Sequence, residues 1–271
     1  MGVLNITPDS FYDGGKFTSV AKAVKQAEQM VADGASIIDV GAESTRPGAM
    51  QVTAAQELAR LTPVVSVLVK EFGQQVLISI DTYKSEVAEA MLALGARMIN
   101  DITALQHDPK IAEVVAQHDA WLVLSHIFGT PQTMMQETRV REDVVADVIA
   151  DLQKSIDVAK KHGVTPEKIS IDPGFGFGKS YEQNLQMLSQ LERFTALGHP
   201  IMVGFSRKKT TGIVLQKKRG LSAVPDASER LFPSIAAHVL AAERGATIIR
   251  THDVREQADA LAFLEALQHV E

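Results

Sequence analysis

The 271-residue chain is 45% hydrophobic and 22% charged with a net charge of −6, a globular composition whose acidic balance argues against non-specific nucleic-acid binding. It contains no cysteine, which excludes disulfide bonds and thiolate metal sites. Because we find no signal-peptide pattern and no apolar run long enough to span a membrane, we expect a cytoplasmic protein without membrane contact.

Short apolar runs alternate with helical patterns along the whole chain. The first run, residues 2–5, is followed by apolar residues at helical spacing from Val20 to Val31, and Gly34 ends that helix. The other predicted strands each lead into a polar loop and then a helix. They cover residues 36–40, 76–80, 98–99, 121–124, 169–172, 201–203 and 247–249.

Several helix starts are marked by capping residues. Thr53 and Ser180 are each followed three positions later by glutamine, which is the capping-box pattern. Asp108 before Pro109 predicts a further start. A long helix is predicted by apolar residues on one face, at positions 145, 148, 152, 156 and 159. Between Lys208 and a helix from about Ser228 the pattern predicts only a loop.

Eight strand–helix units result from this pattern. Alternation of this kind is typical of an α/β protein with a parallel sheet, and eight units most simply close into a (β/α)8 barrel. An open, doubly wound sheet is the alternative. The sequence shows no linker or low-complexity tract, so we expect residues 1–271 to form one domain.

Polar side chains follow nearly every predicted strand. In a (β/α)8 barrel these strand ends form the active-site face. The acids and amides among them could bind a flat heterocycle, and the cations, together with Arg46 from the second loop, could bind phosphate. The strand-end residues are Asn5, Asp81, Asn100, His126, Asp172, Ser206, Arg207, Lys208, Arg250, Thr251 and His252.

Each of these residues also has a purely structural interpretation. A single aspartate after a strand commonly caps the next helix, and Asn100 followed by Asp101 is typical of a turn. Lys208 and Arg250 taken singly read as solvated surface charges, and His126 as a hydrogen-bonded core histidine. Capping does not require a polar residue at almost every strand end, however, and this coincidence favours a binding site.

At this point the motifs resemble one family. Over essentially its full length the chain is similar to the dihydropteroate synthases. The matching motifs, in order, are GVLNITPDSF at 2–11, DVGAESTRPG at 39–48, SIDT at 79–82, IND at 99–101, His126 with GTP at 129–131, DPGFGFGK at 172–179, SRK at 206–208 and RTHD at 250–253. One departure is Ser125, which stands where the family generally has methionine.

The resemblance implies a reaction. 6-Hydroxymethyl-7,8-dihydropterin diphosphate and 4-aminobenzoate would give 7,8-dihydropteroate and diphosphate, by SN1-like loss of the diphosphate and with Mg2+ as cofactor. It also implies a cytoplasmic homodimer formed through the last helices. An alanine at Lys208 or Arg250 is expected to abolish turnover and to leave the fold intact.

The resemblance further implies roles for individual residues. Those expected at the pterin ring are Asp81, Asn100, Asp172 and Lys208. Those expected at the diphosphate are Asn5, Thr45, Arg46, Arg250 and His252, with Asn5 also next to the metal. Those expected at the aminobenzoate are Phe11, Phe177, Ser206 and Lys208. Catalytic roles would fall to Asp13, Asp172, Lys208 and Arg250.

Two other functions are compatible with a pterin-binding barrel. A methyltetrahydrofolate:corrinoid methyltransferase would lack the Ser-Arg-Lys and Arg-x-His motifs at 206–208 and 250–252, both of which are present. A non-catalytic pterin-binding paralogue would lose the first or second loop, and both loop sequences are intact.

Overall fold

The computed structural model describes residues 1–6, 16–43, 51–131, 133–134 and 141–269. Its strands are β1 (Gly2–Asn5), β2 (Ile37–Gly41), β3 (Leu77–Asp81), β4 (Met98–Asp101), β5 (Trp121–Ser125), β6 (Ile169–Asp172), β7 (Ile201–Val203) and β8 (Ala246–Ile249). Its α-helices are α2 (Lys16–Ala32), α3 (Ala54–Phe72), α4 (Ser85–Ala93), α5 (Lys110–Gln117), α6 (Val144–Lys161), α7 (Tyr181–Ser189), α8 (Lys209–Arg219), α9 (Leu231–Glu243) and α10 (Val254–Gln268). Short 3-10 helices cover Pro166–Lys168, Leu191–Leu197 and Ala227–Arg230.

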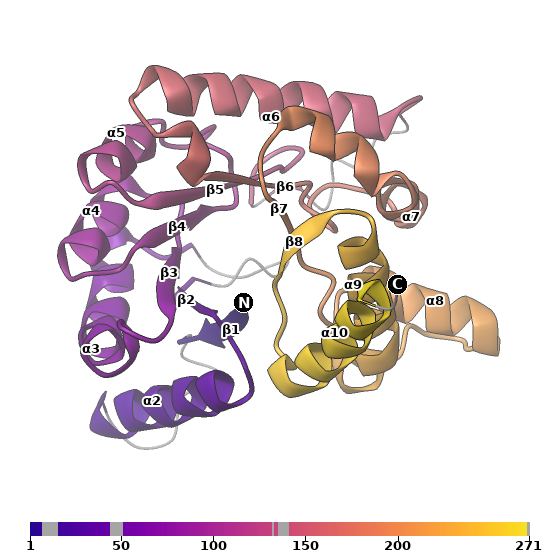
Figure 1. Cartoon of the computed structure of the whole chain (residues 1–271), viewed down its shortest axis with the longest axis horizontal. Helices are drawn as coiled ribbons and strands as arrows, with labels where there is room; N and C mark the ends of the chain where they lie inside the picture. Colours follow the sequence, from indigo (N-terminus) through magenta and orange to yellow (C-terminus); the bar gives the residue numbers. More distant parts are fainter. Residues whose placement is uncertain (7–15, 44–50, 132, 135–140, 270–271) are drawn as a thin grey trace.

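The eight strands form one parallel sheet in chain order, with helices arranged around its outside (Figure 1). A parallel bridge between Gly2 and Thr251 joins the two ends of the sheet. At this seam the Val3 N–H donates to the Thr251 carbonyl, and the Thr251 N–H donates to the Met1 carbonyl, both at 3.0 Å. The predicted (β/α)8 barrel is therefore confirmed, and the open doubly wound alternative is wrong.

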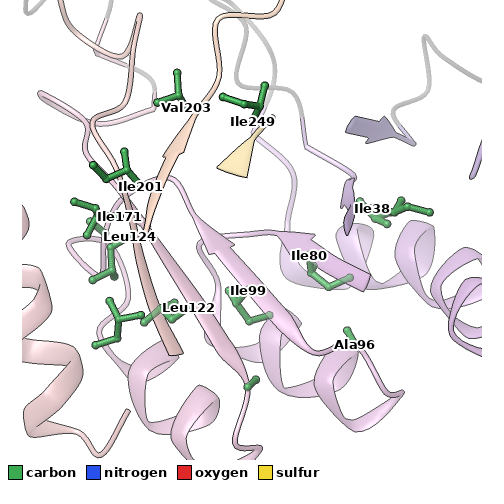
Figure 2. Close-up of a cluster of buried hydrophobic side chains, with 14 of the residues drawn as sticks. Ile38, Ile80, Ala96, Ile99, Leu122, Leu124, Ile171, Ile201, Val203 and Ile249 are labelled. Atoms are coloured by element: carbon green, nitrogen blue, oxygen red, sulfur yellow. The ribbon is translucent and has the colours of Figure 1, made fainter. Parts of the chain in front are cut away.

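Successive side chains of each strand point alternately out of and into the barrel, and this creates two apolar regions. Residues facing outward pack beneath the helices, as Ile80, Ile99, Leu122 and Ile171 do in Figure 2. Inward-facing residues fill the barrel, where Met98, Val123 and Met202 form a smaller cluster. Higher along the same inward face stand polar side chains, and this parity places them in the barrel mouth.

Two of the three capping signals position their helices as expected, whereas α5 begins at Lys110 with Pro109 as its N-cap, one residue later than predicted. Thr53 and Ser180 both form complete capping boxes, with Gln56 and Gln183 as their partners. All five predicted core positions of α6 are buried. Among the described residues, no helix is both long and apolar enough to cross a bilayer.

Helix α8 contradicts the loop predicted after Lys208. Its apolar residues are consecutive, Ile213 to Leu215, so they give no helical period, and its buried residues are Thr210, Thr211 and Gly212. A Cβ on Gly212 would lie 2.6 Å from a Val224 methyl carbon, so the helix packs through its backbone here. Close packing through small residues leaves no hydrophobic pattern in the sequence.

Candidate active site

A cavity opens in the barrel mouth where the strands end. It draws residues from β3 to β7 and from the segments after β4, β6, β7 and β8, so side chains distant in sequence face one space. Its lining consists of Asp81, Asn100, Ile102, Ser125, Asp172, Phe177, Met202, Gly204, Lys208 and Arg250.

Arg250 joins two carboxylates at the edge of this cavity. Its Nε donates to Asp39 Oδ2 at 2.7 Å, and its Nη2 donates to Asp81 Oδ2 at 2.8 Å. The Arg250 side chain is 21% exposed and that of Asp39 is 0% exposed, so the structural interpretation of Arg250 as a solvated surface charge is wrong. Burial raises the pKa of Asp81, while the guanidinium of Arg250 opposes that rise.

Asp172 is held by contacts to both of its oxygens. The Gly174 N–H donates to Oδ1 at 2.7 Å, and the Ser125 hydroxyl lies 3.2 Å from Oδ2. The same hydroxyl lies 3.4 Å from Asn100 Oδ1, so Ser125 connects two residues predicted to bind the ring. Each carboxylate oxygen can accept a second hydrogen bond, which leaves Asp172 able to bind the paired donors of an aminopyrimidine edge.

Asp101, by contrast, has a structural role. Its carboxylate is fully buried and accepts hydrogen bonds from the Thr103 N–H, the Thr103 hydroxyl and the Leu105 N–H. These bonds stabilise a turn in which Ala104 and Leu105 take φ values of 48° and 67°. Turn chemistry therefore accounts for Asp101, whereas its neighbour Asn100 lines the cavity.

A buried lysine organises the glycine-rich loop after β6. Lys179 Nζ donates to the carbonyls of Gly174 at 2.9 Å, Phe177 at 3.1 Å and His126 at 3.3 Å, and lies 3.0 Å from His126 Nδ1. Burial lowers the pKa of Lys179 well below its usual range, but these acceptors suit the three donors of an ammonium group. The loop that carries Phe177 is thus fixed from beneath.

His126 is buried and hydrogen-bonded, which agrees with its structural interpretation as a core histidine. Burial lowers its pKa to about 4, so the imidazole is neutral near pH 7. Its Nδ1 lies 3.0 Å from Lys179 Nζ and its Nε2 lies 3.5 Å from Asp151 Oδ2, so the ring is held between a lysine and a carboxylate.

Gly174 allows the loop to pass close to β5. Its φ is +70°, and a Cβ there would lie 1.8 Å from the His126 carbonyl oxygen. We expect Gly174→Ala to lower the free energy of unfolding by more than the ~1–2 kcal/mol of left-handed strain alone, because backbone atoms must also move. Gly198→Ala is the matched control, since Gly198 has a φ of +71° and nothing within 4 Å of the added carbon. Equal urea-unfolding free energies for the two variants would contradict this account.

Lys208 lies beside the aromatic residue of the loop. Its ammonium donates to the Phe175 carbonyl and sits 4.2 Å from the centre of the Phe177 ring. Burial lowers the pKa of Lys208 to about 8, with Asp172 opposing the shift and Arg250 adding to it. Nearby, the Ser206 hydroxyl and His252 Nδ1 are 2.9 Å apart, which links the ends of β7 and β8.

The site can therefore bind a planar polar ring against carboxylates and an amide, with two cations alongside. A family model described as pterin binding enzyme matches residues 1–252. A curated dihydropteroate synthase from Synechocystis is 43% identical over 98% of this chain and 89% of its own length. The chain belongs to the dihydropteroate synthase family of pterin-binding enzymes.

Two solved structures of dihydropteroate synthase from Xanthomonas albilineans are similar to the fold. The structure with 4-aminobenzoic acid is 41% identical with a TM-score of 0.89, over 100% of this chain and 93% of that one. The structure with 7,8-dihydropteroate is 38% identical with a TM-score of 0.86, over 100% and 94%. The relatives thus favour the synthase over the methyltransferase and the non-catalytic paralogue. Assignment of residues 1–271 to one domain stays a prediction.

The structure brings most of the predicted synthase residues together. Six of them line the cavity: Asp81, Asn100, Asp172, Phe177, Lys208 and Arg250. Asn5 ends β1, and Ser206 and His252 contact each other at the neighbouring strand ends. The remaining four, Phe11, Asp13, Thr45 and Arg46, lie outside the described residues.

Two side chains that contact site residues went unpredicted. Asp39 lies inside a strand, and Lys179 follows a loop. A signal existed for Asp39, because a charged residue flanked by Ile38 and Val40 must face the barrel interior by parity.

Proposed function

We propose that the chain condenses 6-hydroxymethyl-7,8-dihydropterin diphosphate with 4-aminobenzoate, giving 7,8-dihydropteroate and diphosphate. The observation that carries this proposal is the meeting of Asp81, Asn100 and Asp172 with Lys208 and Arg250 in one cavity. Carboxylate and amide match the hydrogen-bonding edge of a pterin, and the guanidinium of Arg250 matches its anionic leaving group.

The reaction breaks the carbon–oxygen bond between the pterin methylene and the diphosphate. Positive charge develops on the methylene of the electron-rich ring, and the oxygen of diphosphate takes the electron pair. Carboxylates near the ring and cations near the leaving group stabilise both changes. The aniline nitrogen of 4-aminobenzoate then forms the new carbon–nitrogen bond and loses a proton, so positioning matters more than a strong base.

The aminobenzoate would lie on the side of the cavity bordered by Phe177, Lys208 and Ser206. The Phe177 ring offers an aromatic face, and Lys208 and Ser206 offer donors for a carboxylate. Phe11, Asp13, Thr45 and Arg46 complete the proposal as the loop residues that close over both substrates.

Mg2+ fits the residues present at the diphosphate end. The ion prefers hard oxygen ligands, and it usually takes one or two from the protein and the rest from phosphate and water. Asn5 supplies an amide oxygen at the end of β1, and in the described part of the chain no cluster of three acids or histidines forms a cage. When bound, the ion would neutralise charge on the departing diphosphate.

The deciding experiment is an assay of purified protein with both substrates, with and without Mg2+. We expect 7,8-dihydropteroate by mass spectrometry and an equal amount of diphosphate. Pterin binding without diphosphate release would favour the non-catalytic paralogue. Methyl transfer from methyltetrahydrofolate to a corrinoid would favour the methyltransferase.

The pH dependence of kcat/KM tests the role of Lys208. Its ammonium form is present below the pKa of about 8 and lost above it, so kcat/KM is expected to fall as the pH rises through 8. Lys208→Arg keeps its charge, so any residual activity in that variant should lack this alkaline decline. An identical decline in both proteins would contradict the assignment to Lys208.

We also propose a homodimer, formed through α9 and α10. The two helices pack against each other (Figure 1). They carry exposed apolar side chains, among them Phe232 at 80% and Phe263 at 69% exposure. Phe263→Glu is expected to shift the protein towards monomers in sedimentation equilibrium, because it places a charge in an apolar interface. Leu94→Glu, at an exposed leucine after α4, is the control and should leave the dimer intact. The cytoplasmic location stays a prediction.

A further inference from the structure

One carboxylate lies beneath the cavity without lining it. Asp39, in the interior of β2, is 0% exposed and accepts three hydrogen bonds from side chains. The Ser79 hydroxyl donates to Oδ1 at 2.7 Å. Asn100 Nδ2 donates to Oδ2 at 3.1 Å, and Arg250 Nε donates to the same atom at 2.7 Å. Two predicted substrate ligands therefore meet at a single oxygen atom.

No sheet pairing holds these two ligands together. Asn100 belongs to β4 and Arg250 follows β8, and these strands are not neighbours in the barrel. Backbone hydrogen bonds alone would leave the long Arg250 side chain many rotamers. The shared oxygen of Asp39 fixes the guanidinium with respect to the amide, which a folded backbone cannot do for side chains of this length.

The contact also determines which atoms remain for substrates. With Nδ2 of Asn100 directed at Asp39, its Oδ1 faces Ser125 and the cavity. The bonds from Arg250 to Asp39 and Asp81 use two of the five guanidinium N–H donors, so further donors can serve an anion. Without Asp39, the guanidinium of Arg250 would be paired with Asp81 alone, and the Arg250–Asp81 ion pair would become tighter.

We propose that Asp39 is a positioning residue of the reaction, which holds Arg250 for the diphosphate and Asn100 for the pterin ring. This inference rests on the proposed function. Because its hydrogen bonds go to Ser79, Asn100 and Arg250, none of which is expected at the aminobenzoate, Asp39 acts on the pterin diphosphate subsite and leaves the aminobenzoate subsite unaffected.

Asp39→Asn tests the proposal, with Ser79→Ala as the matched control. The asparagine keeps the shape but replaces one acceptor oxygen by an NH2 donor, which must then face either Ser79 or the two ligands. Ser79→Ala removes the hydrogen bond from the Ser79 hydroxyl to Asp39 Oδ1 and leaves the bonds of Asp39 to Asn100 and Arg250 in place. Circular dichroism and thermal unfolding establish that each variant is folded before kinetics are compared.

For Asp39→Asn we expect kcat/KM for the pterin diphosphate to fall about tenfold or more, with KM for 4-aminobenzoate within about twofold of wild type. Ser79→Ala should stay near wild type in both. A loss of stability alone would not lower kcat/KM for the pterin diphosphate while leaving KM for 4-aminobenzoate unchanged. Wild-type kinetics in Asp39→Asn, or equal changes in both KM values, would overturn the inference. A wild-type protein that forms no dihydropteroate would instead overturn the proposed function.

A second measurement does not depend on the variant folding. The Nε–H signal of Arg250 in nitrogen–proton NMR spectra, assigned by its loss in Arg250→Lys, should be protected from exchange in the wild-type protein. Adding inorganic diphosphate should leave it protected, because Asp39 continues to hold Nε while other donors bind the anion. Loss of protection on adding diphosphate would show that Asp39 releases Arg250, and the inference would be wrong.

Discussion

Replacing Arg250 with alanine is expected to lower kcat/KM on the order of 10^3-fold, because a preorganised cation beside the leaving group is lost. Diphosphate release in the presence of 4-aminobenzoate measures the effect. The control is Arg255→Ala on α10, which removes an exposed arginine paired with Asp33 at 2.6 Å. That variant should keep wild-type turnover, and an Arg250 variant as active as this control would remove Arg250 from the site.

Arg250→Ala should also destabilise the fold, in contrast to the expectation from sequence. It leaves Asp39 and Asp81, with side chains 0% and 18% exposed, without their shared cation. Breaking a buried pair typically costs about 3–5 kcal/mol, so the midpoint of thermal unfolding should fall clearly below that of Arg255→Ala. Adding Asp39→Asn in the same chain should recover part of this loss, because one of the unpaired buried charges disappears.

Replacing Lys208 with alanine is expected to lower kcat/KM by roughly 10^2–10^3-fold. The ammonium contacts the Phe175 carbonyl and the Phe177 ring, on the wall where the proposed pterin and aminobenzoate subsites meet. Its removal takes away positive charge and a donor where both substrates meet. Single-turnover product formation should show the loss even at saturating substrate.

The stability of the Lys208 variant separates chemistry from folding. No carboxylate is paired with Lys208 by a salt bridge in the described structure, so its loss should cost far less than the loss of Arg250. Lys217→Ala, at a lysine of α8 with a 60% exposed side chain, controls for removal of a surface charge. If the kcat/KM of Lys208→Ala were within a few-fold of that of Lys217→Ala, the assignment of Lys208 to the active site would be wrong.

The side chains at the strand ends were predictable because two rules place them. Alternation along a strand decides which side chains face inward, and the parallel topology brings all the strand ends to one face. A carboxylate or amide directly after an apolar run, as with Asp81, Asn100 and Asp172, ends a strand at the common face of a parallel barrel. The number of strand–helix units then determines closure. For this reason the architecture and five of the six cavity residues follow from local patterns without any knowledge of side-chain contacts, whereas Phe177 was implied only by the family resemblance.

The contacts between these residues could not be predicted in the same way. Arg250 reads as a free cation in the sequence, yet its two partners are 211 and 169 positions away. Parity places Asp39 inside the barrel but does not name its partners, and helix α8 packs through small residues that show no helical period. Ion pairs of this separation depend on side-chain rotamers in the closed barrel, which no local pattern specifies.

The seam of the barrel has one further consequence. The backbone of Thr251 forms hydrogen bonds with Met1 and Val3, which hold the first strand against the end of the sheet. Because Arg250 directly precedes Thr251, the same short segment also positions the guanidinium at the cavity. A polypeptide still emerging from the ribosome cannot close the sheet in this way until residue 251 has been made. Closing the barrel and bringing Arg250 to the cavity are therefore a single event.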